Sequence, residues 1–426
     1  MARSKSQTSL GQILRKLGPG LITGAAQADP SAIGTYAVAG AIVGQRSLWT
    51  AVFSLPLVIA IENICARLGL VTHRGLADIL RRRYPRPVAY AAVALLSLAT
   101  TVNVGADLGA VADSLHLLTG LPALWLIPPT AAAILVLLVA GSYRVIANTL
   151  KVFTLALLTY VLDGFILRPD FADVARFAIV PTLSLDPEYV RVLVAIFGTT
   201  ISPYLFFWQS DEEVEQKRED ARRRGPGAER TSDADMTDAT VDVTSGMSAS
   251  NVIMFFIILS TALTLHAQGR TDVKSGADAA QALRPIAGDL AGLLFAVGMI
   301  GAGLLAVPVL SGATAYALGE TFGWRVGLNE KWRRAKPFYA VIGVATALGV
   351  LLNFTPVRPI EALYWSSVLN GILAPPLLVL IMLAARDQRV MRGQRIGPLL
   401  TALGWATTIA MFLALTVLGA SALGSR

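Results

Sequence analysis

The chain has 426 residues, of which 54% are hydrophobic and 15% charged, and its mean hydropathy is +0.60. This is more apolar side chain than a water-soluble core of this size can bury, so the composition indicates a bilayer as the solvent. The net charge of +8 needs no nucleic-acid partner, because basic loops beside anionic lipid account for it. The single cysteine, Cys65, excludes a disulfide framework and a cysteine metal cluster.

Apolar stretches of the length that crosses a bilayer, roughly 20 residues, follow one another along the chain. Eleven spans are predicted, near 17–44, 48–71, 87–117, 122–141, 146–167, 190–210, 250–268, 286–320, 337–354, 360–385 and 397–421. The chain is therefore expected to be an all-α membrane protein with an amino-terminal segment over 1–16 and a transmembrane domain over 17–421.

The distribution of basic residues predicts the orientation of these spans. If the amino terminus is cytoplasmic, 27 of the 36 Lys and Arg face the cytoplasm and 9 face outside. This bias predicts a multi-pass protein of the cell (inner) membrane, with the amino terminus inside and the carboxyl terminus outside.

The segment 211–247 is rich in Asp, Glu, Arg, Ser, Thr and Gly and has few large apolar residues. Such a composition rarely offsets the entropy of ordering, so a mobile cytoplasmic loop is predicted. The loop is expected to be dispensable, and a protein that lacks residues 222–240 should remain functional. Its first part, 211–218, is also able to continue the sixth span as a solvated helix.

Two spans are interrupted in the same way. In the first span, Pro30 follows Asp29 within a run of small residues, and in the sixth span Pro203 follows Ser202. The breaks stand five spans apart, which is typical of carriers built from two inverted repeats that bind their substrate between the halves. Repeat one is expected over about 17–167 and repeat two over about 190–385, with the span at 397–421 added as helix 11.

Asp29 is the main candidate for chemistry at the first break. An ionised carboxylate without a partner costs several kcal/mol at membrane depth. Pro30 removes a backbone donor, so carbonyls near Gln27 and Ala28 lose their helical partners, and together with the carboxylate they form a hard-oxygen cation site. Alternatively, Asp29 caps the second half-helix through backbone N–H groups; the two roles are compatible.

Other polar residues at depth supplement this site. Thr199, Thr200 and Ser202 surround the second break, although Ser and Thr also commonly bond back to a helix carbonyl. Asp107 in the third span is expected either as a proton relay or vestibule ligand, or as the partner of an Arg or a hydroxyl. Asn370 in the tenth span is a candidate for the same path, with an interhelical hydrogen bond as the alternative.

Three motifs resemble the Nramp family of divalent metal transporters. They are Gly18-Pro-Gly-Leu-Ile-Thr-Gly with Asp29-Pro-Ser-Ala, the stretch from Ala66 through Arg-Arg-Arg-Tyr-Pro85, and Gly198-Thr-Thr-Ile-Ser-Pro203. The resemblance covers spans one to ten in order. It implies a LeuT-type fold of eleven helices in which helices 1 and 6 are interrupted and their breaks form the metal site.

The sequence departs from the family pattern at the proposed ligands. Ala32 stands where the family has an Asn ligand, Ser202 replaces its Met ligand, and Tyr204 replaces its His. Loss of the soft thioether predicts a preference for Mg²⁺ or Mn²⁺, as in the Nramp-related magnesium transporters. Ala110 replaces a Glu, which, with Tyr204, weakens the expectation of proton coupling.

The sequence therefore predicts a secondary carrier or facilitator that moves Mg²⁺ or Mn²⁺ into the cytoplasm by alternating access. The divalent cation is its cargo and no resident cofactor is expected. The alternatives are a proton-coupled Mn²⁺/Fe²⁺ symporter and a LeuT-type carrier of a small organic solute. No nucleophile–base pair or set of metal-ligating His is visible, so an enzyme is not expected.

The departures at Ala110 and Tyr204 predict metal flux without obligatory proton flux. In liposomes carrying an internal pH dye, Mg²⁺ or Mn²⁺ entry should leave the lumenal pH unchanged. Stoichiometric acidification that disappears in Asp107→Asn would contradict this prediction and assign the relay to Asp107.

Overall fold

The computed structural model describes residues 19–140, 158–225, 231–273 and 276–424, and these residues form helices joined by turns, without a strand. Seven segments are long and apolar enough to cross a membrane. They are α4 (Trp49–Thr72), α6 (Arg86–Thr119), α11 (Pro187–Thr200) continued by α12 (Pro203–Arg224), α13 (Asp233–Thr264), α16 (Ala291–Phe322), α18 (Pro359–Arg386) and α19 (Pro398–Gly424).

Shorter helices complete the bundle. They are α2 (Pro19–Gln27), α3 (Pro30–Val43), α7 (Ala123–Ala140), α9 (Leu158–Ile166) and α17 (Lys336–Leu352), with α5 (Leu76–Arg83), α10 (Phe171–Ile179), α14 (Gly276–Ala280) and α15 (Arg284–Ala287) at the ends. Together the helices overlap all eleven predicted spans, and α9 covers residues 158–166 of the span at 146–167. The segment 1–16 lies outside the described residues. The expectation of an all-helical, multi-span protein is confirmed.

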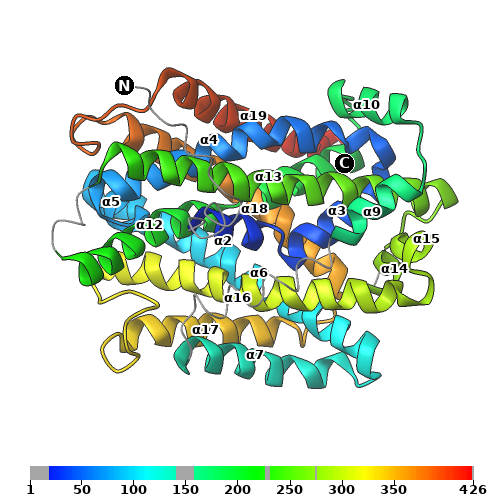
Figure 1. The fold of residues 1–426 in the computed structure, drawn as a ribbon, viewed down its shortest axis with the longest axis horizontal. Coiled ribbons are helices and arrows are strands. Elements are labelled where there is room, and N and C mark those ends of the chain that lie inside the picture. Colours follow the sequence, from blue (N-terminus) through cyan, green and yellow to red (C-terminus); the bar gives the residue numbers. More distant parts are fainter. Residues whose placement is uncertain (1–18, 141–157, 226–230, 274–275, 425–426) are drawn as a thin grey trace, which may run out of the picture.

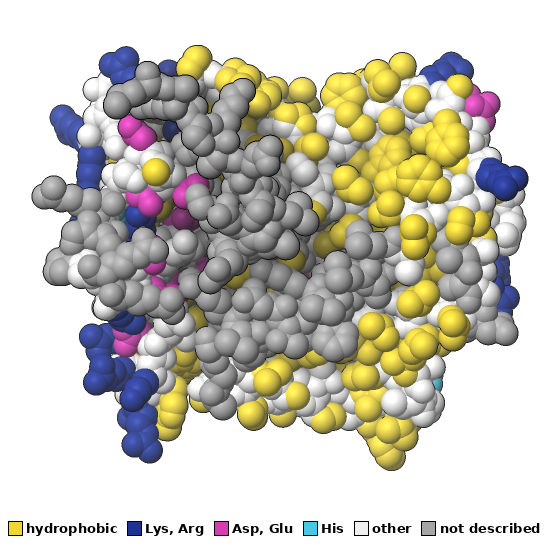
Figure 2. Space-filling view, in the orientation of Figure 1, with side chains coloured by type: hydrophobic (Ala, Val, Ile, Leu, Met, Phe, Trp, Pro, Cys, Tyr) yellow, Lys and Arg dark blue, Asp and Glu magenta, His cyan; other side chains and the backbone are white. Residues whose placement is uncertain are grey.

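The interrupted pair α2 and α3 lies at the centre of the bundle, whereas α19 and the α7–α17 pair lie at opposite edges (Figure 1). All but one of the fourteen residues of α3 are buried, which explains why α3 is apolar on every side. Charged side chains gather at the two ends, most of them at the end of α5 and α12, and hydrophobic side chains dominate the described surface between the ends (Figure 2).

Glycines allow the central helices to approach one another closely. A Cβ on Gly24 of α2 would lie 2.3 Å from the carbonyl carbon of Gly246 in α13, and one on Gly198 of α11 would lie 2.1 Å from the carbonyl oxygen of Ser367 in α18. No side chain fits at such distances, so these contacts require glycine. They hold α2 and α11, the helices that lead to the two breaks, directly against α13 and α18.

The prediction of a loop over 211–247 is wrong for its described residues, because α12 extends to Arg224 and α13 begins at Asp233. The polar side chains find partners inside the protein. Asp242 accepts a hydrogen bond from the free N–H of Gly20 at 2.7 Å, and Glu213 accepts one from Gln209 at 2.9 Å. A prediction from composition treats polar residues as solvated. Here they form hydrogen bonds with one another and with the backbone at the start of α2.

Asp235 connects the two helices that replace the predicted loop. Its Oδ2 lies 2.7 Å from Nζ of Lys217, a side chain that is only 10% exposed, and it closes a capping box with Ser232. Deletion of 222–240 removes these contacts and is therefore expected to destabilise the protein.

Asp235→Ala should lower the free energy of unfolding by about 1–2 kcal/mol, because it removes a cap and leaves a largely buried ammonium without its partner. The matched control is Asp233→Ala, which removes the same charge from the same first turn. Thermal unfolding in detergent compares the two, and equal melting temperatures would show that the contact between Asp235 and Lys217 does not stabilise the helix pair.

Candidate functional site

The first break separates α2 from α3 at residues 28 and 29. Asp29 is extended (φ −72°, ψ 169°), and its Oδ1 accepts a hydrogen bond of 2.6 Å from the backbone N of Ala32. Pro30 occupies the first helical position, where a missing N–H costs nothing. Of the two roles predicted for Asp29, the capping role is therefore observed directly.

The second break separates α11 from α12 at residues 201 and 202. Ser202 precedes Pro203 as the cap residue of α12, but its hydroxyl points back along α11 and donates to the carbonyl oxygens of Gly198 or Thr199, each at 2.8 Å. This is the back-bonding predicted as the structural alternative for Ser202. It also occupies the carbonyl of Thr199.

Side chains from the two breaks contact one another. Nε2 of Gln27 donates to the carbonyl oxygen of Thr200 at 2.9 Å, and the hydroxyl of Tyr204 lies 3.0 Å from both Oδ2 of Asp29 and the carbonyl oxygen of Ala26. The end of α2 is thereby bonded to the end of α11 and the start of α12. Oε1 of Gln27 is buried and has no hydrogen-bond partner within the described residues.

Two residues that the sequence did not single out lie against Thr200. The hydroxyl of Tyr36 is 3.0 Å from Oγ1 of Thr200, and the sulfur of Met254 in α13 is 3.7 Å from the same oxygen. A lone Met in an apolar span carries no local signal that distinguishes it from core. We call Gln27, Asp29, Tyr36, Thr200, Tyr204 and Met254 the break cluster; each is at most 2% exposed.

Asp107 of α6 lies on the far side of the α3 start. Its Oδ1 accepts hydrogen bonds from the backbone N and the hydroxyl of Ser31, at 3.1 and 2.8 Å, and its Oδ2 is buried without a partner in the described residues. The partner is thus a hydroxyl and a backbone N–H, one of the alternatives that the sequence left open. Asp29 and Asp107 bind consecutive N–H groups, where the helix dipole favours negative charge.

The remaining predicted residues lie near the cluster in different ways. Ala32 contributes its N–H to Asp29, and its methyl group offers no ligand. Asn370 is buried in α18, the helix that packs on α11, and neither atom of its amide has a hydrogen-bond partner among the described residues. No hydrogen bond among the described residues joins Asn370 to the two breaks, although the neighbouring Gly371 packs against Gly198 of α11.

The donor set at the breaks defines what the site can bind. Within the described residues, no three His, Cys, Asp or Glu side chains converge as a metal cage. The cluster instead offers one carboxylate, an unpartnered amide oxygen, hydroxyl oxygens and one thioether. Because every member is buried, an ion reaches it only when the surrounding helices part.

A multi-span helical bundle whose two broken helices meet at its centre is the architecture of LeuT-type membrane transport proteins. The solved structures agree in fold. The chain matches a manganese transporter of Eremococcus coleocola with TM-score 0.73 at 19% identity, covering 99% of this chain and 89% of that one. It matches Mhp1, a nucleobase-cation-symport-1 family transporter, with TM-score 0.59 at 14% identity, covering 96% and 93%.

The family model for "Natural resistance-associated macrophage protein-like" proteins (Nramp) matches residues 20–421. The chain therefore belongs to the Nramp family, and it is not an enzyme. It is 26% identical over 407 residues to the divalent metal cation transporter MntH of Deinococcus radiodurans, a match that covers 93% of this chain and 88% of the relative.

Proposed function

We propose that this protein transports divalent metal cations across a membrane, with Mn²⁺ as the first candidate cargo, and that the cation binds at the break cluster. One observation carries the proposal: the buried carboxylate of Asp29 at the first break is bonded to Tyr204, which follows the second break, and Gln27, which bonds the same second break through its nitrogen, keeps a buried amide oxygen without a partner in the described residues. A carboxylate with neutral oxygens is a ligand set that divalent cations prefer.

Ligand roles follow from this arrangement. Asp29 supplies the charge, and the oxygens of Gln27, Thr200 and, after release from its own helix, Ser202 supply neutral ligands, with retained waters filling the shell. Carbonyls near Pro30 and Pro203 join them, including that of Thr199 once the Ser202 hydroxyl has released it. Asp107, Tyr204 and Asn370 are proposed to line the path to the site, and Ala32 leaves room for a water where the family has an Asn.

The two similar transporters described above are a divalent metal cation transporter and a manganese transporter, which supports manganese and gives no support to magnesium. The preference for Mg²⁺ derived from the sequence rested on the absence of sulfur at Ser202. Met254 nevertheless brings a sulfur to the second break from another helix, because its sulfur lies 3.7 Å from Oγ1 of Thr200. A thioether from α13 in place of one from α12 favours Mn²⁺ over the harder Mg²⁺.

The organic-solute alternative finds no support at the α3 start. LeuT-type carriers of carboxylates use a half-helix amino terminus to bind the substrate. Here Asp29 and Asp107 already occupy those N–H groups and would repel an anionic substrate. A cation is the ligand that this arrangement attracts.

We propose that transport occurs by alternating access. We infer that α2–α9 and α11–α18 form two inverted repeats, that α19 is added to them, and that the amino terminus is cytoplasmic and the carboxyl terminus outside. A closed cluster between broken helices is then reached from one side or the other as the helices rock.

Asp29→Asn should abolish divalent transport, because it removes the charge that we assign to the site. The matched control is Asp186→Asn, since Asp186 also caps a helix before a Pro but is exposed. Both variants are assayed for Mn²⁺ uptake in proteoliposomes after their folding in detergent has been verified. Wild-type uptake by Asp29→Asn would show that the cation does not bind at the break cluster.

Met254→Leu keeps the volume and removes the sulfur, so competition by Cd²⁺ against Mn²⁺ should weaken about tenfold while Mg²⁺ competes better. The control is Met247→Leu, two helical turns away in the same helix and equally buried. Competition uptake measures the change. If Met254→Leu keeps the wild-type order of ions, the sulfur is not a ligand, and an all-oxygen site with Mg²⁺ as cargo becomes the better hypothesis.

A further inference from the structure

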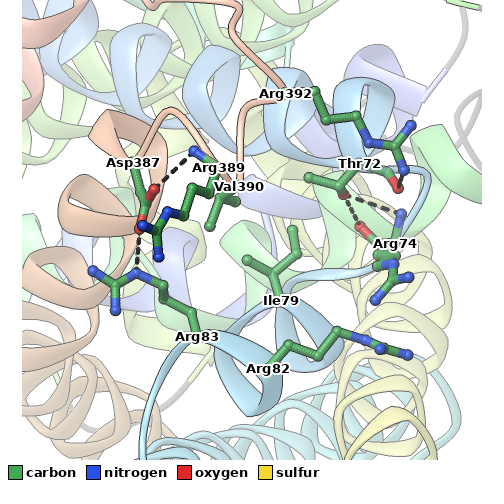
Figure 3. Close-up of a pocket in the computed structure, with 9 residues that line it drawn as sticks. All are labelled: Thr72, Arg74, Ile79, Arg82, Arg83, Asp387, Arg389, Val390 and Arg392. Carbon is green, nitrogen blue, oxygen red and sulfur yellow. Dashed lines mark hydrogen bonds and ion pairs between the residues drawn. The ribbon is translucent and has the colours of Figure 1, made fainter.

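A second feature with a clear chemical character lies away from the break cluster. A pocket of about 710 Å³ opens at the end of the bundle where α4 and α18 stop and α5 begins. Figure 3 shows its lining, which comes from three segments of the chain. The lining residues are Thr72, Arg74, Ile79, Arg82, Arg83, Asp387, Arg389, Val390 and Arg392.

The charges around this arginine pocket do not balance. Asp387 pairs with Arg83 at 2.5 Å, and Asp78 pairs with Arg74, Arg81 and Arg82. The pocket itself is lined by one carboxylate, that of Asp387, and by five guanidinium groups, those of Arg74, Arg82, Arg83, Arg389 and Arg392. Within the described residues neither Arg389 nor Arg392 pairs with a carboxylate, so a positive excess remains that attracts an anion.

Both carboxylates are already committed to their arginines. A hydrogen bond from the backbone N of Arg389, together with Arg83, holds the pKa of Asp387 below its usual range. Burial raises the pKa of Asp78, but hydrogen bonds from Arg81 and Arg82 outweigh it and lower the pKa. Both groups stay ionised near neutral pH, and the excess of four positive charges persists there.

The backbone holds the arginines in place around the pocket. Arg392 donates from its guanidinium to the carbonyl oxygen of Thr72 at 3.0 Å, and its own φ is 48°. His73, between Thr72 and Arg74, has a φ of 56°. His73 is the left-handed residue that ends α4, and the bond from Arg392 to Thr72 joins this helix end to the segment after α18.

The pocket lies close to the lipid-facing surface. It adjoins the connection into α19, whose apolar span is only 22% buried within the protein. Basic side chains gather at this end of the molecule next to the hydrophobic body (Figure 2). Arginine forks bind phosphate oxygens in pairs, which makes phosphate the anion that fits a cluster of guanidinium groups.

We propose that the arginine pocket binds a phosphate group, carried either by an anionic phospholipid headgroup or by a small soluble phosphate compound. The site is separate from the break cluster, and none of the residues of that cluster lines it. The proposal gives a function to Arg82 and Arg83, which the transport site does not use. Bound phosphate joins α5 to the α18–α19 connection and stabilises their contact.

The test uses the full chain in detergent and follows thermal unfolding against two anionic probes, short-chain phosphatidylglycerol and inorganic pyrophosphate. Short-chain phosphatidylcholine is the zwitterionic comparison. The variants are Arg389→Ala and the double variant Arg389→Ala/Arg392→Ala. The control is Arg395→Ala, which removes the same charge from an exposed position of the same connection that does not line the pocket.

At least one anionic probe should stabilise the wild type and Arg395→Ala, and the double variant should need about tenfold more of it for the same shift. A response to phosphatidylglycerol identifies a lipid headgroup, and a response to pyrophosphate identifies a soluble phosphate. If the double variant fails to fold, the single variant Arg389→Ala provides the test, because the Arg389 side chain forms no ion pair within the part of the chain that the structure describes. No response to either probe, an equal response to phosphatidylcholine, or an equal loss in Arg395→Ala would overturn the proposal.

Discussion

Every backbone group that a broken helix releases inside an apolar bundle must find a new partner, and this requirement governs the centre of the protein. The carboxylates of Asp29 and Asp107 take the N–H groups at the start of α3. The side chains of Gln27 and Tyr204 take carbonyls at the ends of α11 and α2. Asp107, Gln27 and Tyr204 come from other helices than the groups they bond, so satisfying the breaks also fixes how α2, α3, α6, α11 and α12 lie together.

The same hydrogen bonds would couple cation binding at the proposed site to movement of the helices. At the cation site proposed above, a bound cation would compete with the Ala32 N–H and the Tyr204 hydroxyl for the oxygens of Asp29, and it would thereby alter contacts that join the helices. A ligand shifts a conformational equilibrium only through its different affinity for the two states. Side chains that bind the cation and also hold the helices together would give the cation a different affinity for the two states.

The charged side chains at the end of the bundle differ in how far they are neutralised by partners within the protein. Along the contact of α2, α12 and α13, buried acids such as Asp242 and Glu213 are satisfied by backbone and amide donors, and they close the structure. In the arginine pocket the guanidinium groups outnumber the carboxylates, and the net positive charge attracts an external anion. The contrast separates polar groups that stabilise the fold from those free to bind a partner.

The sequence by itself determined the class of protein, the helical spans and the two breaks, because hydropathy and the missing N–H of Pro30 and Pro203 act within one or two turns of the chain. It also marked Asp29 as the main candidate ligand. Only the tertiary structure decided that 211–247 is largely helical, that Asp107 binds Ser31, and that the sulfur of Met254 lies beside Thr200. These outcomes depend on partners supplied by distant helices, and the composition or spacing of a local segment contains no information about which group will lie opposite it.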